Sequence, residues 1–130
     1  QRTLLKYFDF LEKAEVITTL SKKAKGIKIM HKPDKIYLGN TNYYFALNIS
    51  GHNTGTLRET FFESQVKVGH DIVFPKEGDF LVDNIHYFEV GGKNKSEKQI
   101  KGLENAYLVK DDIENGAFNQ IPLWLFGFLY

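Results

Sequence analysis

Two short apolar runs decide the fold of this chain: Asp79-Phe80-Leu81-Val82 and His86-Tyr87-Phe88-Glu89-Val90. Both are rich in aromatic and β-branched residues, which favour strands, and only Asp83-Asn84-Ile85 separates them. They therefore predict an antiparallel hairpin. A helical pattern precedes it over Leu57–Lys67, and a third strand is expected after it at Ala106–Val109.

The register of this hairpin decides where its acids point. A two-residue loop would pair Val82 with Ile85 and turn Glu89 away from the face that carries Asp79. A three-residue loop pairs Val82 with His86, places Asp79 opposite Glu89 and gathers the apolar side chains on one face. The second register is the one we expect, because hairpin loops of three residues are common and this one segregates apolar from polar positions.

The segments around the hairpin predict an α/β architecture. Asp71–Phe74 is a strand candidate, and Ser96–Gln99 is a capping-box pattern that predicts a short helix ending near Gly102. Such a crossover favours a parallel strand at Ala106–Val109. Pro122 suits the first position of a last apolar helix. Residues 51–130 therefore predict a mixed sheet flanked by helices.

The first fifty residues predict a different unit. Leu4–Lys13 has the spacing of an amphipathic helix, and Val16–Leu20 reads as a strand that pairs with Ile27–Met30 across a basic turn. Lys35–Leu38 is a further short strand. A helix followed by a β-hairpin is typical of the end of a winged helix. We place the boundary at the polar, glycine-flanked Gly51–Gly55, which divides the chain into 1–50 and 51–130.

Composition excludes several classes of protein. With 17 basic and 16 acidic residues in 130, the net charge of +1 excludes a broadly basic nucleic-acid coat. The lack of cysteine excludes disulfide scaffolds, thiolate zinc sites and cysteine nucleophiles, and fits a cytoplasmic location. No apolar run reaches the ~18 residues of a membrane span, and no signal peptide opens the chain. The chain begins inside a helical pattern, which suggests a piece of a longer protein.

Three acids form the most informative group. Glu59 lies on the predicted helix, Asp79 at a strand start and Glu89 near a strand end. Mg²⁺ takes one or two carboxylates together with water, so Asp79 and Glu89 on neighbouring strands predict a metal site. The alternative is that these acids are solvated residues at strand ends.

Several short motifs resemble one family. Lys76–Val82 and Tyr87–Val90 resemble the "E-x-D-F … E-V-K" pattern of the domain of unknown function that follows the ATPase module in many prokaryotic AAA-type ATPases. Leu57–Phe62 resembles the acidic helix of that domain, and Leu4–Leu47 resembles the winged-helix segment before it. Ile121–Tyr130 is similar to the C-terminus of a subgroup from Bacteroides-like bacteria.

The resemblance implies a PD-(D/E)xK, restriction-endonuclease-like fold in which Glu59, Asp79 and Glu89 surround Mg²⁺. The lysine of the family's Glu-x-Lys motif would fall at Gly91, so Lys93 or Lys95 would have to reach back from the loop, and Lys93 is the expected displaced catalytic lysine. Two functions stay open: metal-dependent phosphodiester hydrolysis on DNA, and a non-catalytic interaction or assembly module with a degenerate motif. ATP would bind an upstream ATPase domain, because this chain has no phosphate-binding G-x-x-x-x-G-K-[ST] loop.

One basic cluster could contact DNA phosphates. It lies at the expected wing and comprises Lys22, Lys23, Lys25 and Lys28. Contacts of this kind would give salt-dependent affinity without sequence preference. The alternative is a soluble hairpin tip. The aromatic residues around Trp124 are expected in the core, or as an exposed patch that would favour a homo-oligomer.

Overall fold

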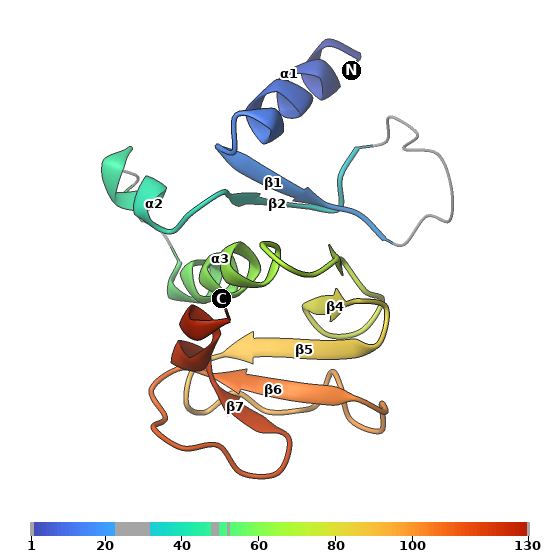
Figure 1. Cartoon of the computed structure of the whole chain (residues 1–130), viewed down its shortest axis with the longest axis vertical. Coiled ribbons are helices and arrows are strands. Elements are labelled where there is room, and N and C mark those ends of the chain that lie inside the picture. The colour runs from blue at the N-terminus through green and yellow to red at the C-terminus, as the bar shows by residue number, and fades with distance from the viewer. Residues whose placement is uncertain (1, 23–31, 48–49, 52, 130) are drawn as a thin grey trace.

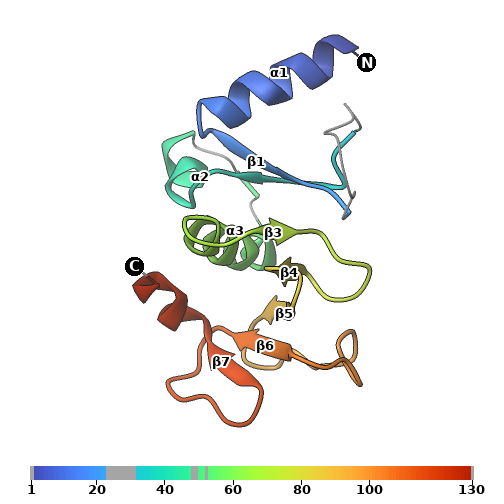
Figure 2. The same cartoon turned by 45° about the vertical axis from the view of Figure 1, so that its right-hand side comes forward.

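A five-stranded mixed sheet and a central helix organise the computed structural model, which describes residues 2–22, 32–47, 50–51 and 53–129. The sheet has the order β3-β4-β5-β6-β7, and α3 lies between it and a two-stranded sheet, β1-β2 (Figures 1 and 2). The elements are α1 (Arg2–Lys13), β1 (Ile17–Leu20), β2 (Lys35–Leu38), α2 (Asn42–Ala46), α3 (Thr54–Val66), β3 (Ile72–Val73), β4 (Phe80–Val82), β5 (His86–Gly91), β6 (Ala106–Lys110), β7 (Gln120–Pro122) and the 3₁₀ helix η1 (Leu123–Phe128).

The central hairpin has the expected register. Strands β4 and β5 are antiparallel with Val82 opposite His86, and the N–H of Asp79 donates to the carbonyl of Phe88 at 2.9 Å. Asp83 and Asn84 in the connecting loop have positive φ angles of 52° and 58°. Asp and Asn tolerate this left-handed region better than most residues, which suits them to a tight hairpin loop.

The crossover after the hairpin is parallel, as predicted, but it is not helical. Strand β6 runs parallel to β5, and β7 parallel to β6. The helix predicted from Ser96 to Gly102 is wrong, because this segment consists of turns. Ile100 is its one buried apolar residue. A segment this short, with no apolar stripe to bury, gains too little to offset the cost of helix nucleation.

The last segment also differs in detail. Pro122 ends β7, a strand that the sequence patterns did not predict, and caps the 3₁₀ helix η1 in place of the expected longer apolar helix. Only Leu123 and Phe126 of η1 are buried. The three-residue spacing of these two anchors matches the three residues per turn of a 3₁₀ helix.

The upstream segment forms the predicted helix α1 and strand β1. Among the described residues, the partner of β1 is β2 rather than the expected Ile27–Met30. β1 pairs antiparallel with β2, Ile17 opposite Leu38. The expected partner Ile27–Met30 lies outside the described residues, so the winged helix stays a prediction. Helix α1 has no buried residue. Within the described ranges, no helix combines the length and the apolar character that crossing a bilayer requires.

The hydrophobic core joins the two sheets through α3. Phe62 is fully buried at its centre, with its ring centroid 5.0 Å from those of Phe80 and Phe88. Leu20 and Tyr37, from β1 and β2, belong to the same cluster. The predicted boundary near residue 51 stays a prediction, while the buried core extends to both sides of it.

Glu63 is a buried acid between α3 and the upstream layer. Its side chain has no exposed surface, and neither carboxylate oxygen has a hydrogen-bond partner within the described ranges. The ammonium of Lys67 lies 3.8 Å away, and Thr18 of β1 and Glu12 of α1 face the same carboxyl group. Burial raises the pKa of Glu63 to about 7, although the charge of Lys67 opposes this rise.

We predict that Glu63→Gln abolishes the decrease in the free energy of unfolding that ionisation of the buried Glu63 causes as the pH rises. The folded-state pKa lies above the ordinary 4.5, so the folded state holds a proton that the unfolded state releases between these values. The contribution of Glu63 is therefore present below pH 4.5 and is lost as the pH rises through about 7. Relative to the wild type, the variant should gain roughly 2–3 kcal/mol between pH 5 and 8 in urea unfolding. If the free energies of unfolding of the two proteins changed with pH to the same extent, this account would be contradicted.

Candidate functional site

The structure brings Glu59, Asp79 and Glu89 to one place at the edge of the core. Glu59 lies on α3, Asp79 directly precedes β4, and Glu89 lies opposite it on β5. Asp79 is 8% exposed and Glu89 is fully buried. Burial, followed by the charges of Glu59 and Glu89, raises the pKa of Asp79 to about 6, and a hydrogen bond from the N–H of Val90 limits the rise. Glu59 and Glu89 are therefore close enough to Asp79 for their charges to raise its pKa.

A lysine from the loop after β5 neutralises the buried Glu89. The Nζ of Lys95 lies 2.6 Å from Oε1 of Glu89. The stem of this lysine passes directly over Gly91: a Cβ added at Gly91 would lie 2.6 Å from both Cγ and Cδ of Lys95. Burial acts to lower the pKa of Lys95, but the hydrogen bond and charge of Glu89 outweigh it and raise that pKa.

Lys95 therefore holds the position beside Glu89 for which sequence analysis nominated Lys93. Lys93 is exposed in the loop. The glycine in the Glu-x-Lys motif was the available signal, since a residue without a side chain leaves room for a stem from elsewhere. The sequence alone did not show which loop lysine would enter that space.

Two residues of β2 also contact the acids, and sequence analysis did not anticipate them. The hydroxyl of Tyr37 donates to Oε2 of Glu59 at 2.6 Å, and Lys35 Nζ lies 3.2 Å from the same oxygen. Lys35 Nζ also lies 3.8 Å from Oδ1 of Asp79. Burial, then the hydrogen bond with Glu59, raises the pKa of Tyr37, so this tyrosine stays a hydrogen-bond donor.

The three acids do not together form a metal-binding group. Within the described ranges, no group of three or more acidic or histidine side chains is arranged to hold a metal. Glu59 is engaged by Tyr37 and Lys35. Oε2 of Glu89 is buried without a hydrogen-bond partner, and a Cβ on Gly78, the neighbour of Asp79, would lie 3.8 Å from it. Two carboxylates completed by water match the preference of Mg²⁺, so Asp79 and Glu89 are the candidate ligands.

The predicted basic cluster is only partly described. Lys22 is exposed, and its backbone N–H donates to Asp34 at 2.8 Å. Lys23, Lys25 and Lys28 lie outside the described residues. Contact of this cluster with DNA stays a prediction.

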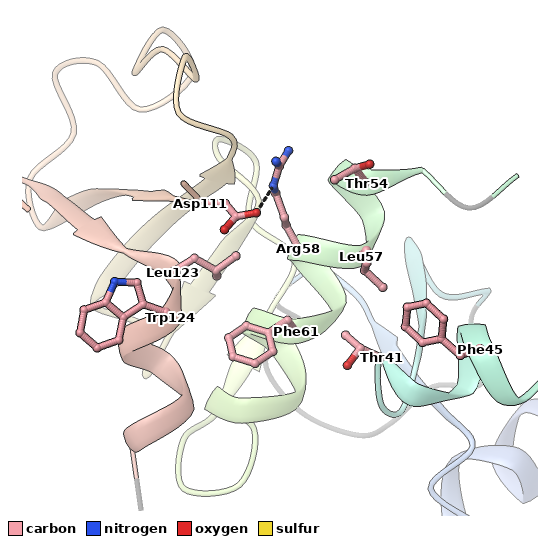
Figure 3. Close-up of a pocket in the computed structure, with 9 residues that line it drawn as sticks. All are labelled: Thr41, Phe45, Thr54, Leu57, Arg58, Phe61, Asp111, Leu123 and Trp124. Carbon is pink, nitrogen blue, oxygen red and sulfur yellow. Dashed lines mark hydrogen bonds and ion pairs between the residues drawn. The ribbon is translucent and has the colours of Figure 1, made fainter. Parts of the chain in front are cut away.

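An apolar groove lies on another part of the surface, among α2, α3 and η1 (Figure 3). Its volume is about 330 Å³, and Leu57, Phe61 and Trp124 are among its lining residues. Arg58 closes one end through an ion pair between its Nε and Asp111 at 2.8 Å (Figure 3). The groove is distinct from the acidic cluster.

Comparison of the chain with protein-family models, curated proteins and solved structures found no match.

We predict that Lys95→Met lowers stability far more than Lys93→Met. Removing the ammonium leaves the Glu89 carboxylate buried without a counter-charge, which should reduce the free energy of unfolding by about 3 kcal/mol. Lys93 is exposed, so its replacement should change stability by less than about 0.5 kcal/mol. Urea unfolding at pH 7 measures both. Equal stability of the two variants would show that Lys95 does not neutralise Glu89 in solution.

Proposed function

We propose that this chain is a nuclease-like, DNA-binding module of a prokaryotic AAA-type ATPase, with a site for a divalent metal at Asp79 and Glu89. The observation that supports this proposal is the buried Glu89–Lys95 pair next to Asp79. The order of acid, acid and lysine is that of the PD-(D/E)xK pattern, with the lysine supplied from four residues beyond Gly91.

The energetic cost of this arrangement favours a functional role. A buried ion pair is often no more stable than apolar side chains of similar size, because both charges lose their hydration. Glu89 is fully buried and one of its oxygens has no hydrogen-bond partner in the described part of the chain. Groups with such unfavourable burial and perturbed pKa values gather at functional sites, and Asp79 beside it has its pKa raised to about 6.

Each residue has a role in the proposed chemistry. Asp79 and Glu89 would hold Mg²⁺, which supplies Lewis-acid polarisation of a phosphate when bound. Lys95 presents a positive charge beside Glu89, where it would stabilise negative charge that develops on a phosphate oxygen. In hydrolysis, water adds to phosphorus, the bond to the leaving oxygen breaks, and that oxygen receives a proton. Glu59 positions Tyr37 and Lys35.

The second candidate is a non-catalytic interaction or assembly module of the same ATPase. The apolar groove among α2, α3 and η1 favours it, because a concave apolar surface of about 330 Å³ can accept a side chain of a partner. Trp124 beside the groove is 52% exposed. This candidate requires neither metal nor cleavage.

We predict nicking of supercoiled plasmid in Mg²⁺ or Mn²⁺, and its loss in Asp79→Asn. The asparagine keeps an oxygen that can accept the N–H of Val90, so the fold should survive while the negative charge is removed. A decrease of roughly a hundredfold or more is expected, because ligand loss removes metal-dependent stabilisation. Lys98→Met, an exposed substitution, is the matched control.

Two results would contradict the nuclease proposal. Equal nicking by the wild type and Asp79→Asn would assign the cleavage to a contaminant. Absence of nicking in both proteins, with each folded by circular dichroism, would favour the non-catalytic module.

A further inference from the structure

Lys35 is held in a cage built from two carboxylates and two rings. Its Nζ lies 3.2 Å from Oε2 of Glu59 and 3.8 Å from Oδ1 of Asp79. The same ammonium lies 5.2 Å from the ring centroid of Phe74 and 5.8 Å from that of Tyr37. Ring faces and carboxylates both attract a cation, so its position is specified from several sides.

The oxygens available to a metal are few. Oδ2 of Asp79 accepts the N–H of Val90 at 2.9 Å, and Oε1 of Glu89 is paired with Lys95. Of the oxygens of Asp79 and Glu89, those not engaged by Val90 or Lys95 are Oδ1 of Asp79 and Oε2 of Glu89. Lys35 faces the first of them, and the second has no hydrogen-bond partner within the described ranges.

A divalent cation and this ammonium would compete for the same carboxylate. Mg²⁺ binds oxygen at about 2.0–2.1 Å, so an ion on Oδ1 of Asp79 would lie within about 6 Å of Lys35 Nζ, which is 3.8 Å from the same oxygen. Two positive charges this close repel each other strongly in a partly buried site. Lys35 must therefore withdraw for the ion to bind fully.

We propose that Lys35 is a tethered cation that competes with a divalent metal for the carboxylate of Asp79. This inference rests on the proposed function, since it concerns the same metal site. It adds that the upstream segment, and not only the α/β unit, sets the affinity of the site.

Strand β2, which carries Lys35, is anchored to α3 by several contacts. Tyr37, two residues after Lys35, lies on the same face of the strand, is 4% exposed and donates to Glu59. Lys67, the C-cap residue of α3, joins this helix to the upstream layer by donating to Thr18 Oγ1 at 2.8 Å and to the carbonyl of Gly39 at 3.2 Å. These contacts fix the backbone of Lys35, so its ammonium stays beside Asp79 unless the side chain itself turns away.

The test is Mn²⁺ binding by isothermal titration calorimetry at pH 7.5 to the wild type and Lys35→Met. Methionine keeps an apolar stem over the rings and removes the charge. We expect the Kd for Mn²⁺ to fall by about tenfold or more, because a nearby competing charge is removed. Lys32→Met, an exposed substitution three residues upstream, and Lys35→Arg, which keeps the charge, should both bind like the wild type. Asp79→Asn in the Lys35→Met background should abolish binding.

The possible outcomes separate this inference from the proposed function. An unchanged or higher Kd in Lys35→Met, with binding that still depends on Asp79, overturns the inference and leaves the metal site standing. No binding in any variant overturns both. If Lys35→Met fails to fold by circular dichroism, Lys35→Gln takes its place, and the same decrease in Kd is required.

Discussion

The arrangement of the site depends on two lysines that neutralise three neighbouring acids. Glu59, Asp79 and Glu89 converge from α3, β4 and β5, and their mutual repulsion in a poorly hydrated place would separate them without counter-charges. Two lysines supply those charges from opposite directions. Lys95 reaches Glu89 from the loop after β5, and Lys35 reaches the other two acids from β2. The acids and the lysines therefore depend on one another for their positions.

The lack of a side chain at Gly91 lets Lys95 reach Glu89. Any side chain there would collide with the stem of Lys95, because even a Cβ would come within 2.6 Å of it. A lysine at position 91 and the present path of Lys95 are therefore mutually exclusive. The glycine that breaks the Glu-x-Lys pattern in sequence is the residue that lets an ammonium reach Glu89 in space.

Local patterns predicted the strands of the fold better than its connections. The apolar alternation around Phe80 and Phe88 specified the hairpin register, because a slip of one residue would have turned every apolar side chain away from α3. The capping-box pattern at Ser96 was misleading, since a cap stabilises a helix only when the helix has an apolar face to bury. The parallel direction of β6 was inferred from that helix, and it is correct although the crossover consists of turns.

The acids of the site could be found from sequence, but the residues that contact them could not. Asp79 and Glu89 are linked by strand register, a short-range property, and Glu59 was grouped with them from its place on the predicted helix, with its role as a metal ligand implied by the resemblance. The contacts of Lys35 and Tyr37 with Glu59 span more than twenty positions and cross from the upstream sheet to α3. A division of the chain near residue 51 separates these partners along the sequence, yet the charge cluster joins them. The upstream layer is thus part of the site in a physical sense, since the charge of its Lys35 acts to lower the pKa of Asp79.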